Sequence, residues 1–365
     1  MNRCHIAYLA CTAALVGTGL GAATPAAAAH TTLVVRPGES IQKAVDAART
    51  GDTVLVLAGT YHESVEISTP GVTLRGMGAA TVIEPAATTA APTAAAKAAP
   101  KAADSCAEGG NGICVVGTKT RNVENVTVAD LAVTGFSRTG VFGMATDTMT
   151  VRRVYAYKNG VWGIAQERSV HGVIQGNYAH DNGDAGIFLA NTVKEEAGAY
   201  DAGQTLVEHN RLENNRIGIT VRRLRNLTVQ ANYVTGNCAG VFVVGDENRP
   251  KAGDLTVTAN RVTENNKSCP KTERLPALQG SGIVLTGTEK TRVTGNLVAR
   301  NAGTSPLSGG IVLFKSFVGV TSDANRIDEN AVENNSPADL VNTDTGKNND
   351  FVRNSCRASQ PAGLC

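Results

Sequence analysis

The sequence predicts a single-domain, all-β fold: a right-handed parallel β-helix, in which coils of roughly 22 residues stack into a solenoid behind a short N-terminal capping helix. Pairs of asparagine spaced five residues apart recur along the chain, and a Gly-Ile or Gly-Val step follows most of them. The shortest Gly-to-Gly steps are 22 or 23 residues, which leaves room for three short strands and three turns but for no helix. Runs such as LTVTANRV alternate in the manner of strands. The pairs, which we expect to form scaffold ladders, are Asn177/Asn182, Asn210/Asn215, Asn232/Asn237, Asn260/Asn265, Asn296/Asn301 and Asn325/Asn330.

The composition fits a folded protein of this kind and excludes other classes. Of 365 residues, 42% are hydrophobic and 4% aromatic, which supplies a core built from small apolar side chains. The formal net charge is +2, so the chain lacks the basic surplus of a general nucleic-acid binder. We therefore expect no nucleic-acid partner, and we expect a monomer.

Residues 1–29 are predicted to be a signal peptide. The chain begins with a short basic segment ending at Arg3, continues with apolar residues 6–23, and reaches four alanines at 26–29 that suit signal peptidase, with cleavage before His30. No later stretch approaches the ~20 apolar residues needed to span a bilayer. We expect a Sec-exported, extracellular protein without a membrane span.

Residues 30–85 are predicted to form the N-terminal cap and the first coils. Ser40 to Ala48 follow a Pro-Gly pair and place Ile41, Ala44, Val45 and Ala48 on one helical face, which suits a helix that closes the end of the stack. A strand over 53–57 then begins the coils. The segments that follow are a flexible Ala/Pro-rich insertion at 86–104, the coils at 105–346 and a C-terminal tail at 347–365.

Six cysteines remain once Cys4 and Cys11 leave with the signal peptide, and an even number in an exported chain predicts three disulfides. Because adjacent coils bring equivalent turns together, Cys238 is expected to pair with Cys269. Proximity in the sequence pairs the others as Cys106–Cys114 and Cys356–Cys365. No CxxC pair occurs, which argues against a zinc site.

The opening run VRPGESIQKAVDAARTGDTVLVLAGTYHESVEI, followed by Asn and Gly-Ile coils, resembles the secreted right-handed β-helix proteins of the pectate-lyase-like superfamily, in particular exported actinobacterial members. The resemblance covers nearly the whole exported chain. It implies the fold. For activity it leaves lyases, hydrolases, epimerases and non-catalytic proteins open.

Motifs of individual enzymes on this fold are weak here. No Asp-Asp pair occurs, which argues against the hydrolases that use one. The nearest match to an R-x-P-x-x-R lyase run, at 274–279, lacks the final Arg. Asp181 and Asp184, in the run Asp-Asn-Gly-Asp, are the best calcium candidates, although the same residues suit a turn. No cofactor is firmly predicted, and calcium stays open.

Residues two apart in the Gly-Ile strands point outward, and most of this outward stripe is apolar. The resemblance implies that this face carries a saccharide groove. Its middle is charged, and insertions that follow these strands flank it. The charged and loop residues are Glu167, Arg168, Arg222, Arg223, Lys315, Asn191, Lys194 and Glu195.

The predicted function is binding of an acidic polysaccharide, extended in its stronger form to lyase-like β-elimination. Elimination needs a base at C5 and a cation beside the uronate carboxylate. Arg222 and Arg223 are candidates for the clamp, with Glu167 in the same groove and Lys194 as a substitute base, because arginine deprotonates poorly. The ligand-binding candidates are Arg168, Trp162 as a ring that stacks on sugar, Asn191, Glu195 and Lys315.

Competing interpretations stay open at this stage. Trp162 can equally be a partly buried turn aromatic, and Arg222, Arg223 and Arg225 can be solvated charges paired with Glu167 and Glu208. A non-catalytic glycan-binding or surface protein would use the same groove without cleavage. A third alternative is a metal-site maturation accessory similar to the β-helix protein that assists copper assembly in nitrous oxide reductase.

Overall fold

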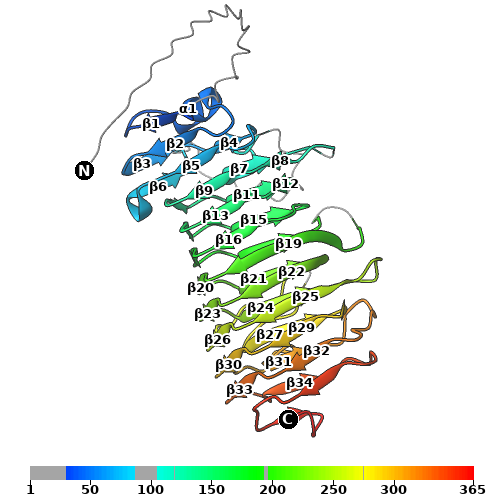
Figure 1. Cartoon of the computed structure of the whole chain (residues 1–365). Helices are drawn as coiled ribbons and strands as arrows, with labels where there is room; N and C mark the ends of the chain where they lie inside the picture. Colours follow the sequence, from blue (N-terminus) through cyan, green and yellow to red (C-terminus); the bar gives the residue numbers. More distant parts are fainter. Residues whose placement is uncertain (1–29, 87–104, 119, 193–195, 274) are drawn as a thin grey trace, which may run out of the picture.

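The computed structural model describes residues 30–86, 105–118, 120–192, 196–273 and 275–365. The predicted signal peptide and nearly all of the predicted 86–104 insertion lie outside the described residues. Within them, three long sheets of parallel strands wind around one interior and form a right-handed parallel β-helix, as predicted (Figure 1). The solenoid runs from the N-terminal cap, in blue, to the last coil, in red.

Each coil contributes one strand to each sheet, in the chain order sheet C, sheet A, sheet B. Sheet A contains β1 (Thr32–Val35), β2 (Thr53–Val56), β5 (Thr73–Arg75), β9 (Thr127–Ala129), β13 (Thr150–Arg152), β16 (Val173–Gln175), β19 (Tyr200–Glu208), β22 (Leu224–Gln230), β25 (Ala252–Thr258), β28 (Thr288–Glu289), β29 (Arg292–Thr294), β32 (Arg326–Asp328) and β35 (Asp350–Val352). Sheet B contains β3 (Gly59–His62), β6 (Thr81–Glu84), β10 (Ala132–Thr134), β14 (Tyr155–Tyr157), β17 (Tyr178–His180), β20 (Arg211–Glu213), β23 (Tyr233–Thr235), β26 (Arg261–Thr263), β30 (Leu297–Ala299) and β33 (Ala331–Glu333). Sheet C contains β4 (Val65–Ile67), β7 (Asn111–Val116), β11 (Thr139–Met144), β15 (Trp162–Glu167), β18 (Ala185–Ala190), β21 (Ile217–Arg222), β24 (Ala239–Val244), β27 (Ser281–Thr286), β31 (Gly309–Leu313), β34 (Leu340–Asn342) and β36 (Ser359–Gln360). A small separate sheet pairs β8 (Val123–Glu124) with β12 (Thr146–Asp147).

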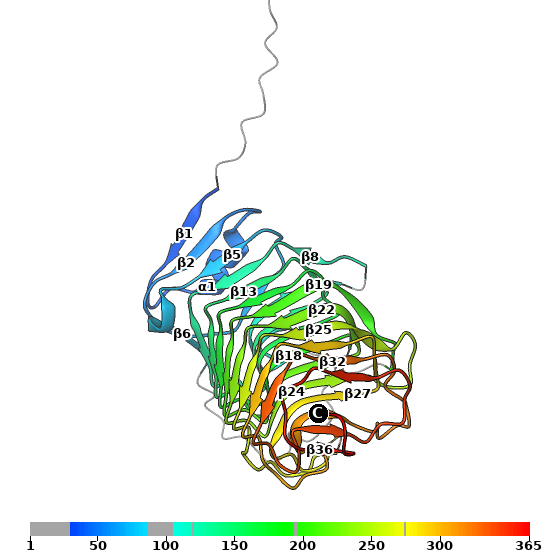
Figure 2. The same ribbon diagram turned by 60° about the horizontal axis from the view of Figure 1, so that its bottom comes forward.

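The interior is filled by columns of β-branched and leucine side chains, one from each coil. Figure 2 shows the coils nested around this common interior. In sheet C the residue after each repeated glycine points inward and is completely buried, which contributes about 1.5–3 kcal/mol per side chain. This column comprises Ile113, Val141, Ile164, Ile187, Ile219, Val241, Ile283 and Ile311. The glycines are required by close packing, since a Cβ at Gly163 would lie 2.7 Å from the carbonyl oxygen of Gly186.

Two ladders of buried asparagines connect the coils at the turns that precede sheet B and sheet C. In each rung the backbone N–H and side-chain amide of one asparagine donate to the Oδ1 of the next. The ladder before sheet B contains Asn177, Asn210, Asn232, Asn260, Asn296, Asn330 and Asn354. The ladder before sheet C contains Asn159, Asn182, Asn215, Asn237, Asn265, Asn301 and Asn335. The scaffold role predicted for the asparagine pairs is confirmed.

One predicted pair is wrong in register. Asn330 bonds to Asn296 and Asn335 bonds to Asn301, so the last pair is Asn330/Asn335 rather than Asn325/Asn330. Asn325 belongs to a different turn, where its amide donates to Asn349. Three asparagines at successive five-residue steps fit the same spacing rule, and only the stacking on the preceding coil selects the correct two.

The N-terminal cap has the predicted helix. α1 (Ile41–Ala47) begins at Ser40, whose hydroxyl accepts from the backbone N–H of Lys43. The carboxylate of Glu63 accepts from the N–H groups of Ile41 and Gln42, so the first coil itself caps the helix. A one-turn 3₁₀ helix, η1, spans Gly78–Ala80. In the described part of the chain, no helix is long and apolar enough to cross a membrane.

All three predicted disulfides are present: Cys106–Cys114, Cys238–Cys269 and Cys356–Cys365. The coils continue past the predicted boundary at residue 346, because β35 pairs with β32 and β36 pairs with β34. The segment predicted as a tail therefore supplies a further, partial coil, and its disulfide lies within it.

Candidate functional site

The outward side chains of sheet C form a second apolar cluster outside the β-helix interior. As predicted, residues two apart in these strands point out, and Phe188, Phe242 and Val312 are among them. They are nevertheless buried, in a cluster that also contains Leu278 of the segment between β26 and β27, the covering segment (residues 266–273 and 275–280). Over these coils, the groove that the resemblance implied is filled by the chain itself.

Arg216 links this covering segment to the β-helix through hydrogen bonds. Its guanidinium donates to the carbonyl oxygens of Pro270 at 2.7 Å and Pro276 at 3.2 Å, and its Nε lies 4.0 Å from Asp184 Oδ1. The side chain is 7% exposed, and this burial lowers the pKa of Arg216 from its usual value. Together with the Cys238–Cys269 disulfide, Arg216 gives the segment a polar and a covalent attachment.

Trp162 belongs to the same outer cluster. Its ring stacks on Phe188 with centroids 4.2 Å apart, and the guanidinium of Arg138 lies 5.3 Å from the ring. The indole N–H donates to Asp184 Oδ2 at 3.1 Å. Only 4% of Trp162 is exposed, so the structure matches the buried-aromatic alternative rather than a ring presented to a sugar.

The predicted catalytic groups lie at the edge where sheet C turns toward sheet A. Glu167 and Arg222 share one row, with Ala190 between them, two coils apart. Glu167 is 4% exposed, and Arg222 is half-buried with its Nη1 3.5 Å from the carbonyl oxygen of Thr192. Arg223 is 3% exposed and pairs with Glu196, at 2.8 Å, and with Asp246. The structure thus gathers the predicted groups but places them among compensating charges.

The other predicted ligand-binding residues are dispersed around this edge. Lys194 and Glu195 lie outside the described residues. Arg168 is half-buried in a left-handed turn, with φ of 46°. Asn191 donates to the carbonyl oxygen of Gly198 at 2.6 Å, which holds the loop after β18. Lys315 is exposed and lies beyond the end of β31, three coils from Arg222.

Partly buried ion pairs continue along the same edge toward the C-terminus. Arg225 pairs with Asp254 and with Glu289, at 2.6 Å. Glu208 instead accepts from Gln175 and Gln230, so the predicted pairing of the arginines with Glu208 is wrong. The reason is that nearer carboxylates come from β25, from β28 and from two loops, Asp246 lying in the loop between β24 and β25.

An ion pair between Lys251 and Asp323 lies at the end of this edge. Lys251 donates to Asp323 at 2.6 Å, which lowers the pKa of Asp323 to about 2. The side chain of Lys251 is 5% exposed and that of Asp323 is 36% exposed, so a buried ammonium is paired with a carboxylate that still contacts water.

The two calcium candidates, Asp181 and Asp184, lie in the turn around Asn182 and contact protein side chains. Asp181 lies 2.7 Å from His180 Nδ1, and Asp184 bonds to Trp162. Among the residues that the structure describes, no group of three or more His, Cys, Asp or Glu side chains is arranged to hold a metal ion. The arrangement corresponds to the turn chemistry that the sequence left open as the alternative.

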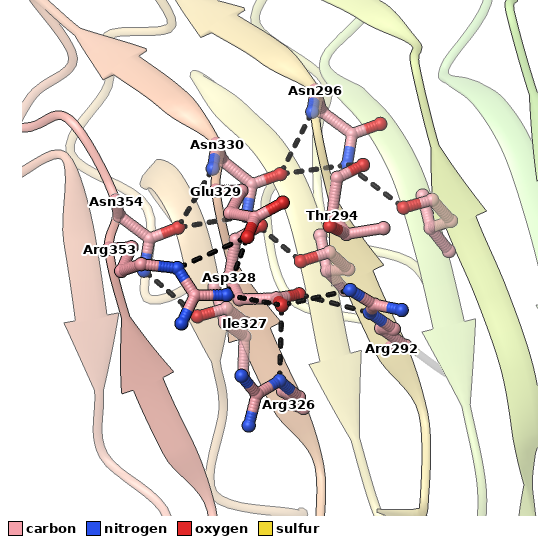
Figure 3. A network of polar contacts seen from close by, with 12 residues as sticks. Arg292, Thr294, Asn296, Arg326, Ile327, Asp328, Glu329, Asn330, Arg353 and Asn354 are labelled. Carbon is pink, nitrogen blue, oxygen red and sulfur yellow. Dashed lines mark hydrogen bonds and ion pairs between the residues drawn. The ribbon is translucent and has the colours of Figure 1, made fainter.

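A further charged network lies on the last coils of sheet A. Figure 3 shows the fully buried carboxylate of Asp328 between the arginines of neighbouring coils. Arg292 donates to it at 3.0 and 3.2 Å and Arg326 at 3.0 Å, while Arg353 pairs mainly with Glu329. Burial acts in the opposite direction, but the hydrogen bonds from Arg292 and Arg326 hold the pKa of Asp328 below its ordinary value. This network joins three coils, and we assign it to stability.

Sequence reasoning missed an aromatic and basic strip on sheet B. Four of the seven tyrosines in the chain lie on its outer face, together with His180 and two arginines. One row comprises Tyr155, Tyr178, Arg211, Tyr233 and Arg261, and a second row beside it comprises Tyr157, His180 and Glu213. The signal was a large residue at the first strand position of successive coils, hidden because an insertion stretches the spacing from 23 residues to 33.

The strip is ordered by contacts between its members. The guanidinium of Arg211 lies 4.9 Å from the ring of Tyr178 and 6.0 Å from that of Tyr233. Glu213 accepts from Arg211 at 2.6 Å and from the Tyr178 hydroxyl at 2.7 Å. Burial, followed by this hydrogen bond, raises the pKa of Tyr178 to about 12, so the phenol stays a neutral donor.

Comparison with known proteins identifies the fold. One family model, the right handed beta helix region, matches residues 103–262, and a second, the periplasmic copper-binding protein (NosD), matches residues 191–361. No curated protein sequence matches this chain.

Three solved structures illustrate the likeness in fold. The A-module of the Azotobacter vinelandii mannuronan C-5 epimerase AlgE4 has a TM-score of 0.55 and 16% identity, with 88% of this chain and 91% of that chain covered. The alginate lyase from Paenibacillus sp. str. FPU-7 has a TM-score of 0.53 and 13% identity, covering 87% and 99%. The C387A mutant of the DFA-IIIase from Arthrobacter chlorophenolicus A6 has a TM-score of 0.57 and 13% identity, covering 86% and 79%. At these identities the likeness shows the fold alone.

Proposed function

We propose that this chain, a right-handed β-helix protein of the pectate-lyase-like superfamily, acts outside the cytoplasm and binds an acidic polysaccharide. Three disulfides and the similarity to a periplasmic family support the location. The epimerase and the lyase to which its fold is similar carry mannuronan and alginate in their names, which supports an acidic glycan as the ligand class.

Binding without cleavage is the form of the proposal that the geometry favours. A lyase needs a base that can reach the substrate and a cation free to meet its carboxylate. The observation that carries the proposal is the state of the predicted catalytic groups: Arg223 is 3% exposed between Glu196 and Asp246, and Glu167 is buried. Guanidinium groups held in this way stabilise the loops of the edge.

The test combines a binding assay with an assay for cleavage. The full chain would be titrated with polygalacturonate and polymannuronate by affinity electrophoresis, and the same samples would be followed at the ultraviolet absorbance of unsaturated uronides, with and without calcium. We expect retarded migration and a flat absorbance trace. A rising trace that Arg222→Gln abolishes would instead establish the lyase, whereas unaltered migration with every polyuronate would refute the proposal.

A second candidate function is assistance in copper-site assembly, which the match to NosD over residues 191–361 favours. Equilibrium dialysis against Cu(I) and Cu(II), followed by metal analysis, tests it directly. Stoichiometric copper that survives competition with a chelator would support this candidate. A copper content equal to the dialysis background would remove it.

A further inference from the structure

We propose that the aromatic and basic strip on sheet B is the surface on which the polysaccharide lies. The strip is the row Tyr155, Tyr178, Arg211, Tyr233 and Arg261 with the adjacent Tyr157, His180 and Glu213. This inference rests on the proposed function, because it assigns a place to the binding proposed there. Sheet C, the face that the resemblance implied, is covered in part, since Leu278 of the covering segment belongs to the apolar cluster on its outer face.

The first argument is periodicity. Successive members of the row are register partners on adjacent coils, so they repeat at the strand spacing of ~4.8 Å and extend over about 19 Å. In an extended 1,4-linked glycan, each pyranose unit advances the chain by nearly the same step. Each sugar unit can therefore meet one tyrosine or arginine of the row. A flat row of this kind suits a linear polymer rather than a small molecule, which is usually held in a concave site.

The second argument is exposure combined with rigidity. Tyr155 and Tyr233 are each 37% exposed and present part of their rings to solvent. The ring of Tyr178 packs edge-on against Tyr155, at 6.3 Å, and Arg211 fills the space between Tyr178 and Tyr233. Side chains immobilised in this way lose little conformational entropy when a ligand binds. Phenol rings offer both an apolar surface to sugar C–H groups and a hydroxyl to sugar oxygens.

The third argument is charge, which selects an acidic glycan. Arg261 is exposed at the end of the row, and among the described residues its guanidinium has no carboxylate partner. Arg211 gives its Nε to Glu213 and keeps its remaining N–H groups at the surface of the strip. Guanidinium groups bind carboxylates through paired hydrogen bonds, so uronate units along the chain would meet these two arginines.

The test compares two variants with a matched control on the full chain. Tyr155→Ala/Tyr233→Ala removes the two exposed rings, and Arg261→Gln removes the unpaired charge. Phe317→Ala removes a 60% exposed ring from the loop after β31, away from sheet B, and serves as the control. Each protein would be titrated by calorimetry with oligogalacturonate, with a neutral 1,4-linked glucan of equal length, and with oligothymidylate.

We expect the double tyrosine variant to bind oligogalacturonate at least 10-fold more weakly. Arg261→Gln should bind about 3- to 10-fold more weakly with a reduced dependence on salt, and Phe317→Ala should bind like the original chain. The melting temperatures of Arg261→Gln and Phe317→Ala should stay within a degree or two, because these side chains are exposed. Arg261→Gln keeps the test decisive if the double variant folds poorly.

The contrary outcomes separate this inference from the proposed function. If the original chain binds oligogalacturonate and both strip variants bind it equally well, the location is refuted and the function stands. If the original chain binds no glycan, both fail. Equal affinity for the neutral glucan would refute the acidic specificity, and binding of oligothymidylate alone would replace the glycan with a nucleic acid.

Discussion

Replacing Asn215 by alanine tests the central claim about the scaffold, that the ladder asparagines hold adjacent coils together. Asn215 Oδ1 accepts from the backbone N–H and the Nδ2 of Asn182, both at 3.0 Å, and its own Nδ2 donates to Ala179 at 3.0 Å and to Asn237 at 3.2 Å. The residue is completely buried, so no water replaces these partners. One orphaned N–H costs about 1–3 kcal/mol, and each further lost bond about 0.5–1.5 kcal/mol. We expect the free energy of unfolding to fall by about 4 kcal/mol.

Hydrogen exchange followed by mass spectrometry measures this locally, at the amide of Asn182. The matched control is Asn354→Ala at the end of the other ladder, where the site is only partly buried and solvent can substitute. There we expect a loss of about 1 kcal/mol.

Asn215→Asp is a second test of the same site. An ionised carboxylate would face the acceptor oxygens of Ala179 and Asn237, and this repulsion raises the pKa of the introduced carboxyl in the folded state. That variant should therefore be relatively more stable below the unfolded pKa near 3.9, and it should lose stability as the pH rises from there through the raised folded pKa. Unchanged exchange at Asn182 in Asn215→Ala would refute the reasoning.

Three further predictions concern the cap, the covering segment and the charged network. Glu63→Ala should destabilise α1 by about 1–2 kcal/mol, because two helix N–H groups lose their acceptor, and exchange should accelerate in residues 41–47 while the later coils are unaffected. Arg216→Met should release the covering segment and increase binding of a hydrophobic dye to the uncovered face, more so when the Cys238–Cys269 disulfide is reduced. Equal dye binding by the two oxidised proteins would show that the disulfide alone suffices, and equal binding in the reduced proteins as well would show that neither attachment holds the segment. Asp328→Asn should lower the free energy of unfolding by about 2 kcal/mol at pH 7. Because the folded pKa of Asp328 is lowered, its stabilisation is present above the unfolded value near 3.9 and disappears as the pH falls through the folded pKa, so the two proteins should converge in acid urea titrations.

The fold was predictable because its determinants are local and repeated. A buried asparagine and a glycine recur from coil to coil. The asparagine bonds to the next coil, and the glycine lets the backbones of adjacent coils approach closely. The wrong register predicted at Asn325 shows that local spacing alone does not determine the pairing. Local spacing allows two registers there, and the choice depends on hydrogen bonds from Asn296 and Asn301 in the preceding coil.

The candidate sites were harder to predict because they depend on contacts between coils of different length. Alternation correctly predicted which sheet C residues point outward, yet it carries no information about the segment that Arg216 fastens over them. The same holds for Arg223, whose partners Glu196 and Asp246 come from two separate loops. The sheet B strip was not predicted because an insertion lengthens the spacing between Tyr178 and Arg211 and so hides the repeat.

The hydrogen bonds between successive asparagines of the ladder before sheet C all run one way, and this gives the solenoid a polarity. Each asparagine donates to the Oδ1 of the next one toward the C-terminus, while its Nδ2 also donates to a carbonyl oxygen of the preceding coil, so an internal coil can be duplicated or deleted without changing what its neighbours require. The final position is different, because it must accept without donating. Asp339 occupies it: one oxygen receives the N–H and side-chain amide of Asn335, and the other receives two backbone N–H groups of the last coil. An ionised carboxylate accepts hydrogen bonds and donates none, so Asp339 can end this series of donors. Adding whole coils at any internal position before Asp339 is therefore compatible with the ladder.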